Sequence, residues 1–364
     1  MKWALVIAFR KLTVTSVFML TSCCIMLVFW ELNCDWSLVT LPRPWMKNDR
    51  KVWKRCEQQN IWSTHTNSSK NVSDLITEVT GLMHCDWERN TTEQNRHRAL
   101  LHSCCNASGG LFLAQTNTHI GQHLIFEAER KKKYTLNQEL YNMLPQSVPW
   151  NKGNLGHCAV VGNGGILLNS SCGAEIDKAD FIIRLNIPPM NYSSDIGTKT
   201  HLVTINPSQI INSFRALAYA RMPFVSRVSE FGPASLVLPM FSFTACQDPS
   251  LRALYTLMEG SPKTQVLLNH PDYMYCLASK WKRLKKRLSS GFIYTSIALE
   301  LCQQVHLYGF WPFPLDLSHK PLPNHYYDNV GPVKNVHAMP QEFQLLLQLH
   351  RQGALQLHVG PCAH

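Results

Sequence analysis

Short apolar runs alternate with longer amphipathic segments along the chain after Pro149. The short runs are bounded by turn residues and predict strands at 159–161, 181–183, 202–205, 236–238, 266–268 and 305–308. The segments between them predict helices near 173–180, 208–220, 248–258, 273–287 and 291–302. Alternating strands and helices predict an α/β sheet that is covered on both faces.

The N-terminal part of the chain has a different pattern. The 19 residues from Leu12 to Trp30 contain no charge, which is long enough to span a bilayer as a helix. Basic residues precede this stretch and Glu31 follows it, so the positive-inside rule leaves residues 1–11 in the cytosol and the rest in the lumen. A cleaved signal peptide is the alternative, but the stretch is long for one and lacks a small-residue cleavage site.

Residues 31–104 are rich in Trp, Asn and Thr and have weak periodicity, so we interpret them as a lumenal stem and lead-in to a folded domain at 105–364. N-glycosylation sequons support lumenal exposure of this region. They stand at Asn67, Asn71, Asn90, Asn106, Asn169 and Asn191. The chain is 45% apolar and 16% charged, which predicts a sizeable buried core rather than a disordered protein.

Cysteine usage agrees with this topology. Of 13 cysteines, Cys23 and Cys24 lie in the predicted span, and the remaining 11 suit disulfides in an oxidising compartment. Eleven is odd, so one thiol should be free or paired between chains. The absence of C-x-x-C excludes the usual zinc-ribbon and thioredoxin motifs.

The formal net charge of +11 includes basic runs at Arg130–Lys133 and between Lys280 and Arg287. Such runs are usually solvated, and nucleic acid is not a plausible partner in the lumen. A basic lumenal surface could attract acidic sugars, acidic lipid headgroups or a nucleotide-sugar.

A glycine-rich turn, Gly162-Asn163-Gly164-Gly165, follows the first predicted strand. Such a turn lets the backbone approach a ligand closely, and it serves equally well as a structural turn. Leu167 replaces the last glycine of the dinucleotide fingerprint, which disfavours a nicotinamide enzyme. Because the sequence also lacks Asp-x-Asp, the motif that holds a divalent ion in many lumenal glycosyltransferases, we expect chemistry without a metal or other cofactor.

Two polar clusters lie near the C-terminus, His325-Tyr326-Tyr327-Asp328 and His337 to Glu342. Histidines in a loop just before a helix, here beginning near Pro340, are suited to proton transfer near neutral pH. Capping or packing roles are the alternative.

With these motifs the sequence resembles the animal sialyltransferases, glycosyltransferase family 29. Residues 158–210 resemble the long sialylmotif, 288–312 the short one, HYYD at 325–328 the third and HAMPQE at 337–342 the very short one. CCNA at 104–107 and HYYDN at 325–329 resemble the α-2,8 branch, which joins sialic acid to sialic acid. The resemblance implies a variant Rossmann-like, GT-A-like fold that uses CMP-sialic acid without metal and inverts the anomeric centre.

The resemblance also implies roles for individual residues. His337 matches the general base, and His325 matches the position that steadies the leaving phosphate. Asn163 and Asn186 match contacts to the donor nucleotide, and Trp311 matches a residue that lines the nucleotide pocket. Contacts to the sialic acid of the donor are implied for Ser289, Ser290 and Gly291.

Two disulfides are implied in the same way, Cys158–Cys302 and Cys172–Cys362, which leaves seven lumenal cysteines unassigned. Two positions depart from the family pattern. Leu185 stands where the long motif usually has Cys, and Ser290 stands where the short motif usually has Thr. We expect the first change to alter packing only, and the second to preserve donor binding because the hydroxyl is kept.

The acceptor is less well defined. Polymer-forming members carry an extended basic stretch before the long motif, whereas here Glu127 and Glu129 dilute Arg130–Lys133. We therefore expect one or a few sialic acids to be added to a ganglioside or glycoprotein glycan by a type II Golgi membrane protein, with homodimerisation left open. The alternatives are a polysialyltransferase, a non-catalytic sialic-acid lectin, which would not need His337 as a base, and an adhesion ectodomain, which would be a β-sandwich.

Overall fold

The computed structural model describes residues 72–150, 154–219, 221–260, 263–281, 284, 286–331 and 336–362. The predicted membrane span and the sequons at Asn67 and Asn71 lie outside these residues. Among the helices that the structure describes, none has the length and apolar character needed to cross a bilayer.

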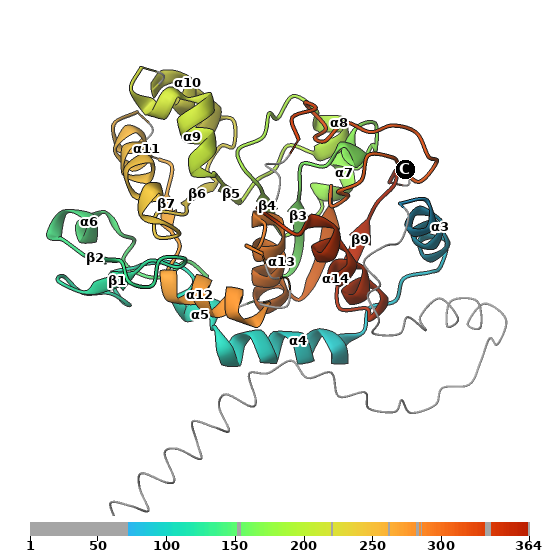
Figure 1. Cartoon of the computed structure of the whole chain (residues 1–364), viewed down its shortest axis with the longest axis horizontal. Helices are drawn as coiled ribbons and strands as arrows, with labels where there is room; N and C mark the ends of the chain where they lie inside the picture. The colour runs from blue at the N-terminus through green and yellow to red at the C-terminus, as the bar shows by residue number, and fades with distance from the viewer. Residues whose placement is uncertain are drawn as a thin grey trace, which may run out of the picture. The chain divides into compact units, whose positions relative to one another are not determined.

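The core of the fold is a seven-stranded, fully parallel sheet (Figure 1). Its strands are β3 (His157–Val161), β4 (Phe181–Arg184), β5 (Leu202–Thr204), β6 (Ser235–Leu238), β7 (Val266–Leu268), β8 (Gln304–Tyr308) and β9 (Gln356–His358), in the spatial order β7-β6-β5-β4-β3-β8-β9. The first six match the strands predicted from the sequence. The sequence analysis missed β9 and the antiparallel hairpin of β1 (His123–Ile125) and β2 (Lys133–Thr135).

The helices of the sheet region are α7 (Gly173–Ile176), α8 (Ser193–Ile196), α9 (Pro207–Ser213), α10 (Arg221–Ser229), α11 (Gln247–Gly260), α12 (Pro271–Lys280), α13 (Ser290–Leu301) and α14 (Met339–Arg351). The prediction of one helix over 208–220 was wrong, because Ala216 has a φ of 51° and interrupts the helical backbone. The prediction of a helix to residue 287 was also wrong. α12 ends at Lys280, beside Trp281, whose ring packs edge-on against Phe292 at 4.8 Å.

Strand residues alternate between two apolar layers. Ala159 and Val161 of β3 and Ile182 of β4 face a cluster that includes Ile176 of α7, and β5–β7 continue this layer toward α9, α10 and α11. After β7 the chain returns to place β8 beside β3 and β9 beside β8, where α13 packs against β3 and β8 and α14 packs against β9. Burial on both faces explains why the strands are continuous apolar runs.

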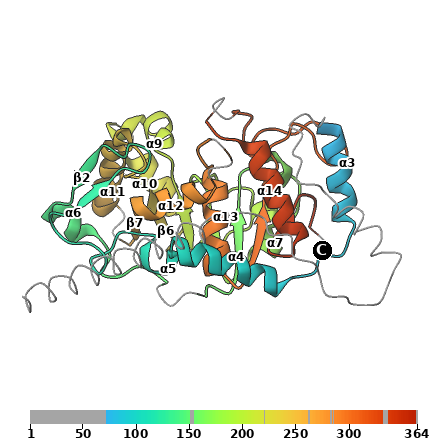
Figure 2. The same ribbon diagram turned by 60° about the horizontal axis from the view of Figure 1, so that its bottom comes forward.

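The folded region begins well before residue 105. α3 (Val72–Met83) and α4 (Thr91–Cys104) are helical, and α4 packs across the C-terminal end of α13 (Figures 1 and 2). The buried carboxylate of Glu300 joins the two segments by accepting hydrogen bonds from the Ala107 N–H and from His102. Residues 72–104 therefore belong to the same folded unit as the predicted catalytic domain rather than to an extended stem.

The four described sequon asparagines, Asn90, Asn106, Asn169 and Asn191, are all exposed. Asn90 and Asn106 also cap helices, since their side chains accept hydrogen bonds from the N–H groups of Glu93 (3.1 Å) and Gly109 (3.2 Å). α5 (Ala107–Gly110) and α6 (Gln138–Met143) complete the N-terminal segment.

Both implied disulfides, Cys158–Cys302 and Cys172–Cys362, are bonded in the structure. The first joins β3 to the residue after α13, and the second fixes the C-terminal segment to the start of α7. A third disulfide, Cys105–Cys276, was not predicted. Among the cysteines whose side chains the structure describes, Cys246 is the free thiol, and it is buried.

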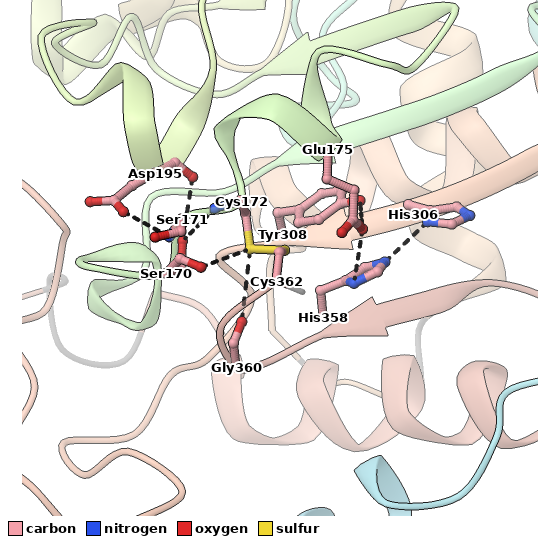
Figure 3. Close-up of a disulfide and its surroundings, with 10 residues drawn as sticks. All are labelled: Ser170, Ser171, Cys172, Glu175, Asp195, His306, Tyr308, His358, Gly360 and Cys362. Carbon is pink, nitrogen blue, oxygen red and sulfur yellow. Dashed lines mark hydrogen bonds and ion pairs between the residues drawn. A yellow bond between two sulfur atoms is a disulfide. The ribbon is translucent and has the colours of Figure 1, made fainter. Parts of the chain in front are cut away.

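A histidine cluster lies beside the Cys172–Cys362 disulfide (Figure 3). His306 Nδ1 and His358 Nε2 are 3.0 Å apart, and His358 Nδ1 lies 3.5 Å from Glu175 Oε1, which also accepts a hydrogen bond from the Tyr308 hydroxyl. Burial lowers the pKa of His306 to about 3 and that of His358 to about 4. These rings are therefore neutral parts of the core.

This cluster predicts acid sensitivity. Folded-state pKa values below the ordinary 6.5 mean that the unfolded chain binds protons first, so stability is full above about pH 6.5 and falls toward pH 4. We expect the melting temperature of the purified protein to drop between pH 7 and pH 5, and His306→Gln to flatten this dependence. His119→Gln, at an exposed position, is the control. An unchanged slope in His306→Gln would contradict the assignment.

Candidate active site

The strand order reverses between β3 and β8, and ligands of open α/β sheets bind at the carboxyl ends of strands beside such a reversal. Here the two chain segments leaving β3 and β8 are hydrogen-bonded to each other. The N–H of Gly162 donates to the Tyr308 carbonyl at 2.7 Å, and that of Gly164 donates to the Gly309 carbonyl at 3.0 Å. A Cβ at either glycine would lie within 2.7 Å of the Gly309 oxygen, so these glycines are needed for the backbone contact itself.

The third motif is attached to this turn. The N–H of Tyr326 donates to the Asn163 carbonyl at 3.0 Å, and Gly164 and His325 form a β-bridge. His325 Nδ1 lies 2.6 Å from Asp328 Oδ1, which orients the ring and leaves Nε2 for a ligand. The buried Oδ1 of Asn163 accepts no hydrogen bond, whereas its Nδ2 donates to the Leu185 carbonyl. An unsatisfied buried acceptor at this edge suits a ligand that donates a hydrogen bond.

Asparagines follow four of the parallel strands: Asn163, Asn186, Asn206 and Asn269. Asn186 Oδ1 accepts from the Asn206 N–H at 3.0 Å, and the Ser290 hydroxyl donates to Asn206 Oδ1 at 3.3 Å. The predicted Asn186 and Ser290 are therefore joined through Asn206. Sequence reasoning missed Asn206 and Asn269, although an amide directly after a buried strand is the same signal that marks Asn163.

The N-terminus of α13 carries the start of the short motif. Ser289 caps the helix by accepting from the Phe292 N–H at 3.1 Å, and its own N–H and hydroxyl both donate to the Glu342 carboxylate. Burial raises the pKa of Glu342, and the Ser289 hydrogen bonds oppose that rise. The N–H groups of Ser290 and Gly291 fall in the first turn, where they have no intrahelical acceptor and can bind an anion.

His337 lies beside this helix start. Its Nδ1 is 2.9 Å from the Arg287 carbonyl oxygen. A carbonyl can only accept, so Nδ1 carries the proton, and Nε2 of the neutral ring is left as the proton acceptor.

A pocket of about 290 Å³ lies at the carboxyl ends of β5, β6 and β7. Ser290 and His337 line it together with Asn206, Asn269 and Arg287. Tyr294 and Asn269 are hydrogen-bonded at 3.2 Å in its wall, and the free Cys246 also lines it. The pocket therefore combines a proton acceptor, the start of a helix and several amide and hydroxyl groups.

Residues 112–354 match the family model of glycosyltransferase family 29 (sialyltransferase). The chain belongs to this family. Its relatives include human alpha-2,8-sialyltransferase 8E, which is 42% identical over 80% of this chain and 79% of the relative. Mouse alpha-2,8-sialyltransferase 8F is 39% identical over 90% and 86%, respectively. The structure is similar to a crystal structure of a mammalian sialyltransferase, with a TM-score of 0.50, 22% identity and coverage of 75% of this chain and 96% of that chain.

In this sialyltransferase, Trp311 lies in an aromatic cluster. It is 4% exposed, its indole N–H donates to the Leu315 carbonyl at 2.7 Å, and its ring packs edge-on against Phe313 and Phe343. The implied contact with the nucleotide stays a prediction. Leu185, at the position where the long motif usually has Cys, is buried.

Potential metal ligands gather elsewhere in the sialyltransferase. Within the described residues, Glu175, His306 and His358 form a group whose ligand atoms lie within 4.8 Å of one another. None of the three lines the pocket beside His337. His306 and His358 are hydrogen-bonded to each other at 3.0 Å, and His358 lies 3.5 Å from Glu175.

Proposed function

We propose that this sialyltransferase is an α-2,8-sialyltransferase that moves sialic acid from CMP-sialic acid to the terminal sialic acid of a ganglioside or glycoprotein glycan. The observation that carries the proposal is the pocket in which His337 and the start of α13 meet, in a chain about 40% identical to alpha-2,8-sialyltransferases. We further propose that the enzyme is anchored in the Golgi membrane by residues 12–30, with its catalytic domain in the lumen.

The donor site in this proposal extends from the Asn163 turn to the start of α13. CMP carries one phosphate, which the N–H groups at a helix N-terminus can bind without a divalent ion. His325, oriented by Asp328, would bind the phosphate as it leaves. The Asn186–Asn206–Ser290 chain of hydrogen bonds would keep the nucleotide-binding and sialic-acid-binding groups in register.

The acceptor hydroxyl would be deprotonated by His337 Nε2 as it attacks C2 of the donor sialic acid. Attack from the face opposite CMP breaks the bond to the phosphate oxygen and inverts the anomeric centre through an oxocarbenium-like state. The proton passes to His337, and the charge of the leaving group stays on the phosphate. The Arg287 carbonyl also stabilises the imidazolium that forms, because it accepts from Nδ1–H.

Addition of one or a few residues also has structural support. Arg130, from the short basic run, lies 3.8 Å from Asp272 and 4.1 Å above the ring of Tyr275. This arginine is engaged within the fold, which leaves a smaller basic surface for a polyanionic product.

The proposal is tested with purified protein, CMP-sialic acid and three acceptors, namely sialyllactose, sialyllactosylceramide and a sialylated glycoprotein, each beside its desialylated form. We expect transfer only to sialylated acceptors, with products sensitive to an α-2,8-cleaving sialidase. Transfer confined to desialylated acceptors would refute the α-2,8 assignment, and hydrolysis of the donor with no transfer would refute the acceptor class.

A second prediction concerns metal. Because the donor has a single phosphate and the sequence has no Asp-x-Asp, we propose that turnover needs no divalent ion. The enzyme should keep most of its activity in excess EDTA. Loss of turnover that manganese or magnesium restores would contradict this proposal.

A third prediction concerns His337. Positioned bases contribute on the order of 10²–10⁴-fold to a rate, so His337→Ala and His337→Gln should abolish transfer while leaving CMP affinity and melting temperature close to those of the parent. His325→Ala should instead weaken CMP binding. Turnover above about a tenth of the parental value in either His337 variant, more than loss of a positioned base allows, would exclude it as the base. His119→Gln serves as the exposed-histidine control.

A further inference from the structure

The described residues that line the pocket beside His337 include basic side chains but no acidic ones. Apart from His337, Arg287 is the only ionisable basic side chain among the described residues that line it, and no carboxylate is among them. A pocket with this lining favours an anionic ligand over a neutral sugar.

The guanidinium of Arg287 is held in place by an aromatic ring and by a long ion pair, neither of which takes up its hydrogen-bond donors. It lies 4.3 Å above the ring of Phe243, and its Nη2 is 4.0 Å from Glu127 Oε2, which is beyond hydrogen-bonding distance. Glu127 instead accepts a hydrogen bond from the Ser242 hydroxyl at 3.1 Å. Burial raises the pKa of Glu127, and Arg287 opposes that rise.

Within the described residues, the Arg287 guanidinium donates no hydrogen bond, and its side chain is 34% exposed. Its N–H donors form a planar fork that matches both oxygens of a carboxylate. A fixed, partly desolvated guanidinium with open donors at the edge of a pocket is a suitable carboxylate-binding group.

We propose that this pocket is the acceptor subsite and that Arg287 binds the carboxylate of the sialic acid that receives the transfer. This inference rests on the proposed α-2,8 activity. A terminal sialic acid has a carboxylate at C1, whereas a terminal galactose or N-acetylgalactosamine has none. Arg287 therefore selects acceptors that are already sialylated.

The position of Arg287 in the chain connects this selection to the chemistry. Its carbonyl holds His337 Nδ1, and Ser289, which caps α13, is two residues further on. Arg287, His337 and Ser290 also line the same pocket, so a carboxylate bound at Arg287 shares that pocket with the proposed base and the start of the proposed donor site. The pocket volume of about 290 Å³ is at the lower end of the usual range for ligand sites and suits one sugar residue.

The test combines two changes, one in the enzyme and one in the acceptor. The enzymes are the parent, Arg287→Gln, Arg287→Lys and the control Arg252→Gln. Arg252 is exposed on α11, pairs with Asp248 and does not line the pocket.

The acceptors are sialyllactosylceramide and its C1 carboxamide, which keeps the shape of the sugar but not its charge. The measured quantity is kcat/KM for the acceptor at saturating CMP-sialic acid, together with KM for the donor.

A lost charge-assisted hydrogen bond should lower kcat/KM by about 10- to 100-fold. We expect the parent and Arg252→Gln to prefer the acid over the carboxamide by such a factor. Arg287→Gln should use both acceptors equally poorly with its donor KM unchanged, and Arg287→Lys should keep part of the preference. An acid-to-carboxamide ratio in Arg287→Gln that equals the parental ratio would overturn the inference.

If Arg287→Gln fails to fold, the parent enzyme alone still tests the inference. A parent with equal kcat/KM for the acid and the carboxamide does not recognise the acceptor carboxylate. That result, with transfer to the sialylated lipid intact, overturns the role of Arg287 and leaves the proposed function in place. Transfer to desialylated lactosylceramide alone would overturn both.

Discussion

The close backbone contact between the segments that leave β3 and β8 is the constraint on which the site depends. It requires positions without a Cβ at Gly162 and Gly164, because the Gly309 carbonyl occupies that space. The turn formed in this way presents the Asn163 carbonyl, to which the loop of His325 is attached. The disulfide between Cys158 and Cys302 ties the same strand to the end of α13, so both sides of the strand-order reversal are covalently linked.

A second connection joins the two C-terminal motifs. Glu342, in the first turn of α14, accepts hydrogen bonds from the backbone and hydroxyl of Ser289 at the start of α13. A buried carboxylate with these partners is costly to leave unpaired, so the loop that carries His337 cannot separate from α13 without exposing it. The geometry of the proposed base and of the helix start is therefore set by one buried side chain that need not touch a substrate.

The strands β3–β8 were predictable because burial on both faces makes each one a continuous apolar run. β9 was not, since Gln356 and His358 are polar and only partly buried, Leu357 alone is a buried apolar residue, and His358 is held by its contact with His306. The boundary of the folded domain was misplaced for a similar reason. α4 is polar on average. It is held to α13 by the contact of His102 with Glu300 and by that of Arg98 with the Cys302 carbonyl, which no periodicity reveals. Likewise, the residues of the pocket come from five separate segments, so the sequence marked His337 as a candidate for proton transfer and the motif resemblance pointed to Ser290, but neither showed that the two share a pocket.

The role of the positively charged residues can be assigned only from the three-dimensional structure. In the sequence, Arg130 and Arg287 look alike, since each belongs to a short basic run with no obvious partner. In the structure, Arg130 pairs with the exposed Asp272 and lies over Tyr275, whereas Arg287 lies over Phe243, has a long ion pair with Glu127 and lines the pocket. A net charge attracts acidic glycans in general, whereas the proposed recognition of one carboxylate needs a single oriented guanidinium in the same pocket as the base. In the proposed mechanism, acceptor choice then depends on which arginine the fold places in the pocket with open hydrogen-bond donors, and not on the number of basic residues.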